Sequence, residues 1–583
     1  MRRGEIQARG GFDGQYGTVT AIGPEDRAAF SGQGRLFEVS PRPVKAAART
    51  APARPPKEEK PPEAARGPAS AAPPPLLLSR GDLLLDGLDG SQVAAVTSRD
   101  PVLCVVAGPG SGKTRVLVHR AAWLLRENLV RPEEMLLTTF TRKAAEELAP
   151  RLAAALPFRP ESGRVRVSTL HALAYDILKK QRPDWELAPE DYLADLLKKA
   201  AQKAGLKPPA FSSLLSLEKN SPALRPGESG LAAKTAGKFS AACRYYQQAL
   251  SVRRCWDFDD LILEADPDGP PPFKAILVDE FQDLSAAQFS FLKRLRPPET
   301  SRPAPASLTV IGDPEQSIYA FRGARREIFD WLKIYSGLRQ VELTANYRAT
   351  RSLILAGEAL MAAPGRPRRL AGRNEAGPRL TRAVLSSPRR EAAYVTARLR
   401  AHLGVLTLGG EASSRQDAEF MPGLALSDIA VIFRLRSQGA ELAAALDQAG
   451  LAWQMSGEEA LTAADDLDFT ADKISLLTMH AAKGLEFRLV FIVGAEEGLC
   501  PYFAPSEEAT AARLAEEKRL FYVALTRARD RLYLTRAAGR RLYGRPLPGR
   551  PSPFWDLLPP GLCRDLQPRL PRGRARRQPT LFD

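Results

Sequence analysis

A glycine-rich segment, Ala107-Gly108-Pro109-Gly110-Ser111-Gly112-Lys113-Thr114, connects the apolar run Val102–Val106 to a helical pattern over Arg115–Arg126. Glycines in such a segment let backbone N–H groups surround phosphate oxygens, while the lysine neutralises the β and γ oxygens and the following hydroxyl can ligate Mg²⁺. The order of strand, loop and helix therefore predicts an α/β domain that binds ATP or GTP. The segment alone leaves open which P-loop enzyme carries it, a small-molecule kinase included.

Short aliphatic or β-branched runs alternate with helical patterns along most of the chain, which predicts parallel α/β layers. The first series comprises Val102–Val106, Met135–Thr138, Val165–Ser168, Ile276–Asp279 and Leu308–Ile311. The second series comprises Ile429–Phe433, Ile474–Leu477, Leu489–Val493 and Arg531–Leu534. Two series predict two nucleotide-type domains, and the mostly helical residues 176–256 interrupt the first of them.

Composition shifts place the expected boundaries of five segments. Residues 1–40 are a short N-terminal segment, and residues 41–80 are a Pro/Ala-rich linker that cannot bury enough apolar surface to fold. The first domain then covers 81–350 and the second 351–560. Residues 561–583 are Arg- and Pro-rich, so we expect a disordered basic tail.

The charge balance points to a polyanionic partner. The formal net charge is +17 over 583 residues, and neutralising phosphates releases counterions, which drives binding to nucleic acids. Five cysteines without a C-x-x-C pair predict neither a disulfide framework nor a metal cage. We find neither a run of about 18 apolar residues nor an apolar N-terminal segment, so we expect a cytoplasmic protein with no membrane partner.

Two adjacent carboxylates end the apolar run that begins at Ala275. Asp279 stands where a strand-end acid can hold the magnesium shell, and Glu280 can orient and deprotonate an attacking water. A kinase must instead exclude water from the γ-phosphate. After a P-loop, this pair therefore favours nucleotide hydrolysis.

Further signatures follow over about residues 86–555. They are Leu88–Gln92, Thr139–Ala145, Thr169–His171, Asp257–Leu261, Asp279–Asp283, Gly312–Ala324, Asn346–Arg348, Thr478–Phe487 and Val523–Arg529. Together with the P-loop, this series resembles the superfamily 1 DNA helicases of the UvrD/PcrA/Rep type. The resemblance implies two RecA-like P-loop NTPase motor domains, with a helical insertion in the first at about 176–256. It also implies ATP-driven 3′→5′ movement along single-stranded DNA, in DNA repair or replication.

The resemblance assigns roles around ATP and Mg²⁺. The implied catalytic residues are Lys113, Asp279, Glu280, Gln316, Arg348 and Arg527, of which Gln316 senses the γ-phosphate and the two arginines reach it from the second domain. Such arginines stabilise transition-state charge. Thr114 and Asp279 are the implied metal ligands. The nucleotide-binding set is Gln92, Ala107, Gly108, Pro109, Gly110, Ser111, Gly112, Lys113, Thr114, Arg115, Tyr347 and Glu486, with Gln92 reading adenine, Tyr347 stacking on it and Glu486 holding the ribose.

The resemblance also implies contacts with single-stranded DNA and with single/double-strand junctions. The implied DNA-binding residues are Phe140, His171, Tyr319, Phe321, Arg322 and His480. Aromatic rings stack on any base, which suits a protein that moves regardless of sequence. The family usually has Trp at the position of Phe321 and more often Phe at that of Leu170.

The second domain departs from the family. Its members carry a large helical insertion before the strand that begins at Ile474, whereas this chain has only a short acidic loop at 458–473. That insertion contacts the duplex, and its loss puts unaided strand separation in doubt. The alternative function is therefore a non-unwinding single-strand DNA translocase that serves a nuclease or another partner.

Both ends carry short motifs that suggest partners. Gly11–Gly17 resembles a segment near the end of PHP-type phosphoesterases. This resemblance suggests that residues 1–40 are a remnant of such a nuclease module. It also suggests that the chain is the motor half of a longer or split protein. Gln578–Phe582 resembles the peptide by which bacterial enzymes bind the sliding clamp, and Gln33–Phe37 fits the same pattern.

Two other classes are disfavoured. A catalytically dead DNA-binding subunit would not need the complete set of catalytic side chains. A nuclease fused at the C-terminus would need more chain than the short Arg/Pro-rich tail.

Overall fold

A computed structural model describes residues 84–155, 164–220, 233–267, 273–296, 307–320, 323–325, 327–362, 371–372, 375–404, 420–455, 467–468, 471–503 and 509–566, with the backbone of two short N-terminal strands. The chain divides into two compact units, Met1–Pro75 and Leu76–Asp583. In the first unit, β1 (Gln7–Ala8) pairs antiparallel with β2 (Val19–Thr20). The second unit contains both predicted nucleotide-type domains.

Several predictions fall outside the described residues. They concern the segment Gly11–Gly17, the linker 41–80, most of the acidic loop 458–473, the tail motif Gln578–Phe582, and the DNA contacts Phe321 and Arg322. They stay predictions. In the part of the chain that the structure describes, no helix has the length and apolar character needed to cross a membrane.

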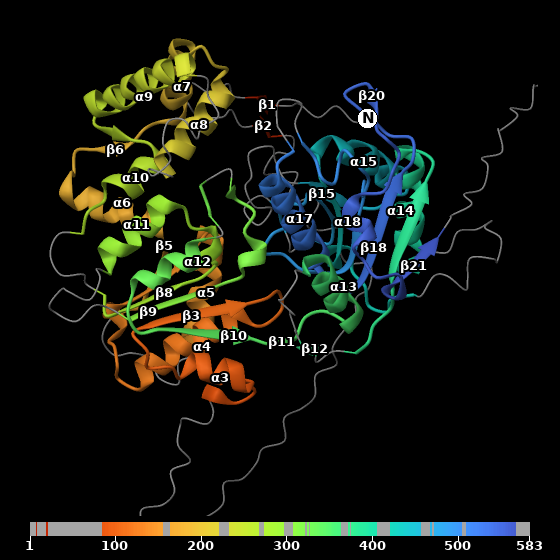
Figure 1. The fold of residues 1–583 in the computed structure, drawn as a ribbon, viewed down its shortest axis with the longest axis horizontal. Coiled ribbons are helices and arrows are strands. Elements are labelled where there is room, and N and C mark those ends of the chain that lie inside the picture. Colours follow the sequence, from red (N-terminus) through yellow and green to blue (C-terminus); the bar gives the residue numbers. More distant parts are fainter. Residues whose placement is uncertain are drawn as a thin grey trace, which may run out of the picture. The chain divides into compact units, whose positions relative to one another are not determined.

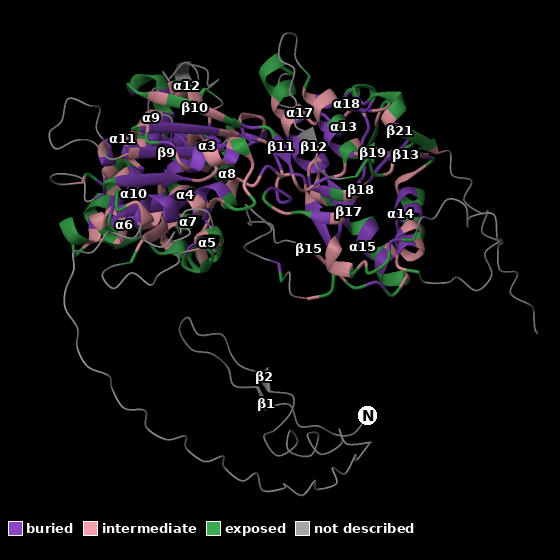
Figure 2. Ribbon diagram, turned by 90° about the horizontal axis from the view of Figure 1, so that it is seen from below, coloured by how far each residue is buried: buried purple, intermediate pink, exposed green. Residues whose placement is uncertain are grey.

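The first sheet contains six parallel strands in the order β10-β3-β9-β8-β4-β5. Their bounds are β3 (Val102–Ala107), β4 (Met135–Thr139), β5 (Arg166–Thr169), β8 (Ala275–Val278), β9 (Ser307–Gly312) and β10 (Leu338–Leu343). Alternate side chains of β3 face two different cores, Val102 and Cys104 in one and Leu103 and Val105 in the other. Helices therefore cover both faces, as a parallel sheet requires, and Figure 2 shows the central strand β9 as mostly buried.

Seven helices belong to this first sheet: α3 (Gly90–Val96), α4 (Lys113–Arg126), α5 (Arg142–Ala155), α6 (Leu170–Gln181), α10 (Phe258–Glu264), α11 (Ala286–Leu295) and α12 (Ile328–Trp331). The five predicted strands form, with ends shifted by one residue. The sixth strand, β10, was not predicted. It lies at the sheet edge and carries Arg339, Gln340 and Glu342, so its apolar pattern is weak.

The helical insertion has its own hydrophobic core. The helices α7 (Glu190–Ala204), α8 (Pro208–Asn220) and α9 (Ala233–Arg253) pack together (Figure 1), and the strand β6 (Glu186–Leu187) pairs with β7 (Cys255–Trp256). Its core residues include Leu196, Phe211 and Tyr246. The predicted start at residue 176 is wrong, because α6 continues to Gln181 and packs in the core of the sheet through Leu178.

The second sheet contains seven parallel strands in the order β15-β16-β14-β17-β18-β13-β21. Their bounds are β13 (Leu380–Leu385), β14 (Ile429–Phe433), β15 (Trp453–Met455), β16 (Ile474–Thr478), β17 (Phe487–Ile492), β18 (Ala528–Ala537) and β21 (Cys563–Leu566). Its helices are α13 (Arg351–Met361), α14 (Pro388–His402), α15 (Gly439–Gln448), α17 (Ala511–Leu525) and α18 (Pro553–Asp556). Two parallel sheets with covering helices confirm the predicted α/β class with two RecA-like domains.

The strand β21 corrects the predicted disordered tail, which was expected to begin at residue 561. β21 adds an edge strand beside β13, and Cys563 is buried. Arg382 of β13 donates to both oxygens of Asp565, at 2.7 Å each, so an ion pair fastens this edge. An edge strand of four residues with Arg and Asp at its centre carries little apolar signal, which explains why the composition concealed it.

A buried ionic triad stabilises the second sheet. The guanidinium of Arg540 donates to the carboxylates of Glu391 and Glu496, and all three side chains are largely buried. Glu391 also accepts from the hydroxyl of Thr535 at 2.6 Å, and Glu496 accepts from the backbone of Ala537 at 2.7 Å. The triad thus ties α14 and the segment after β17 to β18.

Replacing Arg540 with methionine should lower the thermal unfolding midpoint by about 6–12 °C. The substitution leaves two buried carboxylates without a counter-charge, which costs about 3 kcal/mol, and 1 kcal/mol shifts the midpoint by roughly 2–4 °C in a domain the size of the second one. The matched control is Arg541→Met, because Arg541 is exposed. Scanning calorimetry would contradict the account if both variants melted together.

Candidate functional site

The P-loop joins the end of β3 to the start of α4. Gly110 and Gly112 adopt left-handed conformations, with φ of +71° and +84°, which glycine reaches at no steric cost. The hydroxyl of Ser111 donates to the carbonyl of Gly108 at 2.8 Å, and Lys113 Nζ lies 3.3 Å from the carbonyl of Ala107. Thr114 follows in the first turn of α4, where backbone N–H groups and the helix dipole favour an anion.

Gln92 supports the loop from α3. Its Nε2 donates to the carbonyl of Ser111 at 2.9 Å, and its Oε1 accepts from the backbone N–H of Asp89 at 3.1 Å. The side chain is fully buried. Both ends of the amide are thus engaged within the protein, and the predicted adenine-reading role of Gln92 stays a prediction. Arg115, also predicted to bind nucleotide, is exposed and donates to the carbonyl of Asp86 at 3.4 Å.

The two strand-end acids stand directly after β8. Glu280 has a left-handed backbone, with φ of 48°, and its N–H donates to the Asp279 carboxylate at 2.9 Å. Gln282 is fully buried and donates to the Glu280 carboxylate, while its own carbonyl oxygen accepts from the N–H of Asp313 at 2.9 Å. The peptide turn and the Gln282 amide thus fix the direction of the Glu280 carboxylate.

The electrostatic surroundings shift the pKa values of Asp279 and Glu280 in opposite directions. Burial, together with the neighbouring Glu280 charge, raises the pKa of Asp279 to about 7. Burial opposes ionisation of Glu280 too, but the positive charges of Lys113 and Lys483 outweigh it and lower the pKa of Glu280. Glu280 is therefore held ionised, as a proton acceptor must be.

The oxygen donors fit magnesium. The Asp279 carboxylate and the Thr114 hydroxyl are hard ligands, and a cation beside Asp279 would relieve its repulsion with Glu280. Within the described ranges, no group of three or more His, Cys, Asp or Glu side chains could hold a metal by itself. Mg²⁺ usually binds through one or two protein oxygens plus phosphates and water, and Thr114 and Asp279 stay its predicted ligands.

The segment Asn346–Arg348 closes on the tip of the P-loop. Asn346 Nδ2 donates to the carbonyl of Pro109 at 2.6 Å, and the N–H of Tyr347 donates to the carbonyl of Gly110 at 2.9 Å. A Cβ on Gly110 would stand 2.6 Å from that of Arg348, so only glycine permits this approach. The Tyr347 hydroxyl lies 2.5 Å from an Asp89 carboxylate oxygen, which places its ring beside the N-terminus of α3.

Two arginines lie where the two domains meet. Arg527 is 2% exposed, and its Nη2 donates to Gln316 Oε1 at 3.1 Å. Burial lowers the pKa of Arg527 to about 10, which leaves it charged at neutral pH. Arg348 pairs with Glu486 at 2.6 Å, and the predicted ribose contact of Glu486 stays a prediction.

A buried lysine that the sequence did not single out lies at the centre of these contacts. Lys483 Nζ stands 2.5 and 2.6 Å from the two carboxylate oxygens of Asp283 and 2.8 Å from the carbonyl of Gln316. The same ammonium lies 4.7 Å from the ring centroid of Tyr319. Lys483 comes from the loop after β16, whereas its partners come from the first domain, so it joins the two.

Two aromatic pairs are candidates for nucleic-acid contact. Phe140 stacks on Tyr319, with ring centroids 5.4 Å apart, and His171 stacks on Phe258 at 4.0 Å. Tyr319 is only 2% exposed and its ring supports Phe140, and its predicted base contact stays a prediction. His480 is neutral, since burial and two neighbouring cations lower its pKa to about 3.

Sequence reasoning did not single out Phe258 or Tyr543, two of the exposed aromatics among the described residues. Phe258 is 55% exposed and Tyr543 is 74% exposed. Phe258 lies inside the quoted signature Asp257–Leu261, where an apolar residue between carboxylates at the start of a helix was the available signal. Tyr543 lies in the turn between β19 (Arg541–Leu542) and β20 (Arg545–Pro546), among arginines.

Comparisons with known proteins find sequence similarity to DNA helicases. The UvrD/REP helicase N-terminal domain matches residues 88–333, and the UvrD-like helicase C-terminal domain matches residues 457–539. The chain is 26% identical to the ATP-dependent DNA helicase PcrA of Leuconostoc citreum, over 86% of this chain and 89% of that protein. It is 27% identical to DNA helicase II of Escherichia coli (82% and 88%) and 29% identical to a probable DNA helicase of Mycoplasma pneumoniae (77% and 83%).

Replacing Lys483 with methionine should lower nucleotide turnover at least about tenfold and change nucleotide affinity little. The substitution leaves the buried Asp283 carboxylate unpaired beside the acids, and tenfold corresponds to about 1.4 kcal/mol, less than the usual cost of such a charge. The control is Lys473→Met, since Lys473 is exposed. Phosphate-release assays with nucleotide titrations measure both quantities, and wild-type turnover in Lys483→Met would refute the role.

Proposed function

We propose that this chain, which carries the N- and C-terminal domains of the UvrD/REP family of ATP-dependent DNA helicases, moves 3′→5′ along single-stranded DNA. The observation that supports this most directly is the hydrogen bond between Arg527 and Gln316. It brings an arginine of the second domain to the proposed γ-phosphate sensor of the first. Hydrolysis that changes this contact changes the relation between the two domains, which is what a stepping motor requires.

The ATP chemistry follows from the placement of the side chains. Lys113 would exchange the loop carbonyls for β and γ oxygens of ATP, and Glu280 would take the proton of the attacking water. Arg348 and Arg527 would meet the negative charge that develops on the transferred group. Thr114 and Asp279 would hold Mg²⁺, which neutralises phosphate charge when bound.

DNA contact is proposed for the exposed aromatic surfaces and the basic chain as a whole. His171 with Phe258, and Phe140 above Tyr319, offer ring faces that accept any base. Tyr543 and His480 extend the proposed contacts into the second domain. Lys483 contacts Asp283 and Gln316 as well as the ring of Tyr319. A conformational change at the ATP site would therefore be transmitted by Lys483 to the Phe140–Tyr319 stack.

Replacing Glu280 with glutamine should retain ATP binding and abolish hydrolysis stimulated by single-stranded DNA, by a factor of about 10² or more. The amide keeps the shape of the side chain but cannot accept the proton. Turnover is measured with and without oligo-dT, and binding with a fluorescent ATP analogue. Lys113→Ala, which removes the phosphate ligand, should instead lose binding. Unchanged turnover in Glu280→Gln would end the assignment of Glu280 as the base.

A shortened second domain is proposed from the connection between its strands. β15 ends at Met455 and β16 begins at Ile474, so no large insertion fits between them. The alignment with PcrA has 675 positions but contains only 86% of the 583 residues of this chain. Roughly a quarter of the aligned positions are therefore gaps in this chain. Both facts support the absence of the duplex-contacting insertion. They favour the second candidate function, a translocase that does not unwind alone.

The purified chain should translocate 3′→5′ on single strands yet unwind long 3′-tailed duplexes poorly. Translocation needs the two motor domains, whereas strand separation also needs a contact with the duplex. Displacement of streptavidin from biotinylated 3′ or 5′ ends reports translocation and its direction, and release of a labelled strand from a long tailed duplex reports unwinding. Efficient unwinding by the chain alone would contradict the proposal.

A further inference from the structure

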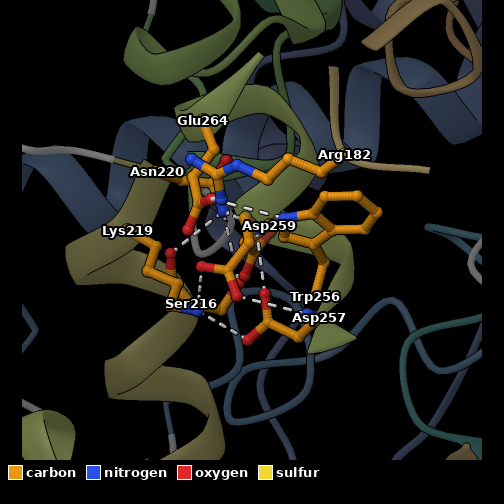
Figure 3. Close-up of polar contacts among 9 residues, drawn as sticks. Arg182, Ser216, Lys219, Asn220, Trp256, Asp257, Asp259 and Glu264 are labelled. Atoms are coloured by element: carbon orange, nitrogen blue, oxygen red, sulfur yellow. Dashed lines mark hydrogen bonds and ion pairs between the residues drawn. The ribbon is translucent and has the colours of Figure 1, made fainter. Parts of the chain in front are cut away.

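The helical insertion is fastened to the first motor domain by a buried polar network. Lys219 Nζ, at the end of α8, stands 2.6 Å from an Asp257 oxygen and 2.7 Å from an Asp260 oxygen. The next residue, Asn220, donates to Asp259 at 2.7 Å. Figure 3 shows the α8 side chains meeting the carboxylates that precede and begin α10. The side chains of Lys219 and Asp260 are 10% and 3% exposed.

This network holds the N-terminus of a helix that carries an exposed aromatic ring. Asp257 is the N-cap of α10 and forms a capping box with Asp260. Phe258 is the first residue of α10, and its 55% exposed ring lies on His171 with only 14° between the ring planes. The other end of α10 is fixed separately, since Glu264 accepts from Trp256 at 3.3 Å and pairs with Arg182 at 2.6 Å.

The charge balance at this end of α10 depends on the insertion. Three carboxylates fall within four residues, and burial raises the pKa of Asp259 and raises that of Asp260 to about 6. Burial opposes the charge of Lys219, but Asp257 and Asp260 outweigh it and raise its pKa. Tyr246 of α9 also faces Lys219, with 5.3 Å from Nζ to the ring centroid, and its neutral phenol adds no charge. Lys219 is the cation that lets these carboxylates stand together.

We propose that Lys219 and Asn220 are positioning residues for single-stranded DNA, because they fix the start of α10 so that Phe258 and His171 form one base-stacking surface. The inference rests on the proposed function and assigns a task to the insertion in the first domain. Lys219 itself does not contact phosphate, since its ammonium is buried and committed to two carboxylates. Its effect on DNA therefore passes through Phe258.

Replacing Lys219 with methionine should raise the oligo-dT concentration for half-maximal ATPase stimulation about tenfold and leave ATP turnover without DNA unchanged. A stacked base contributes roughly 1–3 kcal/mol, so a misplaced ring loses a factor of this order. Anisotropy of labelled oligo-dT should show the same shift. The slope of log affinity against log salt should stay at its wild-type value, because no phosphate contact is removed.

A double-mutant cycle separates positioning from a general loss of stability. In a Phe258→Ala background, Lys219→Met should add no further loss of DNA affinity, since the ring it positions is already gone. Lys219→Met/Asp260→Asn should recover most of the affinity, because the amide oxygen can still accept from Asp257 and one carboxylate is removed. Lys238→Met is the matched control, as Lys238 is an exposed lysine of the same insertion.

Asn220→Ala is a milder second variant and should shift DNA affinity in the same direction, again with no added effect in Phe258→Ala. An equal loss for Lys219→Met with and without Phe258, or a lower melting midpoint with unchanged DNA affinity, would overturn the proposal. A reduced salt slope would also overturn it, since this would indicate a direct phosphate contact. Absence of stimulation of the wild-type chain by oligo-dT would instead refute the proposed function itself.

Discussion

The ammonium of Lys483 is the interaction on which the arrangement of the site depends. A buried cation must be surrounded by acceptors, and the acceptors of Lys483 lie on the other domain, in Asp283 and the carbonyl of Gln316. Satisfying this one charge therefore sets the loop after β16 against the strand-end acids. The same ammonium lies against the ring of Tyr319. Lys483 therefore connects the Phe140–Tyr319 stack to the residues proposed to act on the nucleotide.

The buried charges of this chain serve geometry more than stability. Replacing a buried ion pair with apolar residues is often neutral or stabilising, whereas removing one partner is costly. Lys483, Lys219 and Arg540 each satisfy carboxylates contributed by a different segment of the chain. A hydrophobic contact would hold such segments together but would not select one orientation. Directional bonds to carboxylate oxygens do select one, and the proposed roles of Glu280 and Arg527 would require that selection.

Sequence reasoning found the parts whose physics is local. The P-loop, the apolar strands and the two acids after β8 follow from short patterns, and the family resemblance supplied Gln316 and Arg527. It failed where a partner distant in sequence decides the outcome. β10 and β21 are polar edge strands defined by their neighbours. The side-chain neighbours of Gln92 and Tyr319 were not foreseen either, and their predicted roles stay predictions: Gln92 donates to the carbonyl of Ser111, and Tyr319 contacts Phe140 and Lys483. Nothing in the spacing of Lys219 indicated that it would meet carboxylates near residue 257.

The two aromatic pairs differ in what supports them, and this difference has a mechanical consequence. Tyr319 under Phe140 contacts Lys483, which belongs to the second domain, so this pair responds when the domains move relative to each other. Phe258 against His171 is supported by the insertion and by α6, both parts of the first domain. One stacking surface is thus coupled to the ATP site and the other is independent of it. The proposed movement along a strand would need both kinds of contact, because one must release while the other holds.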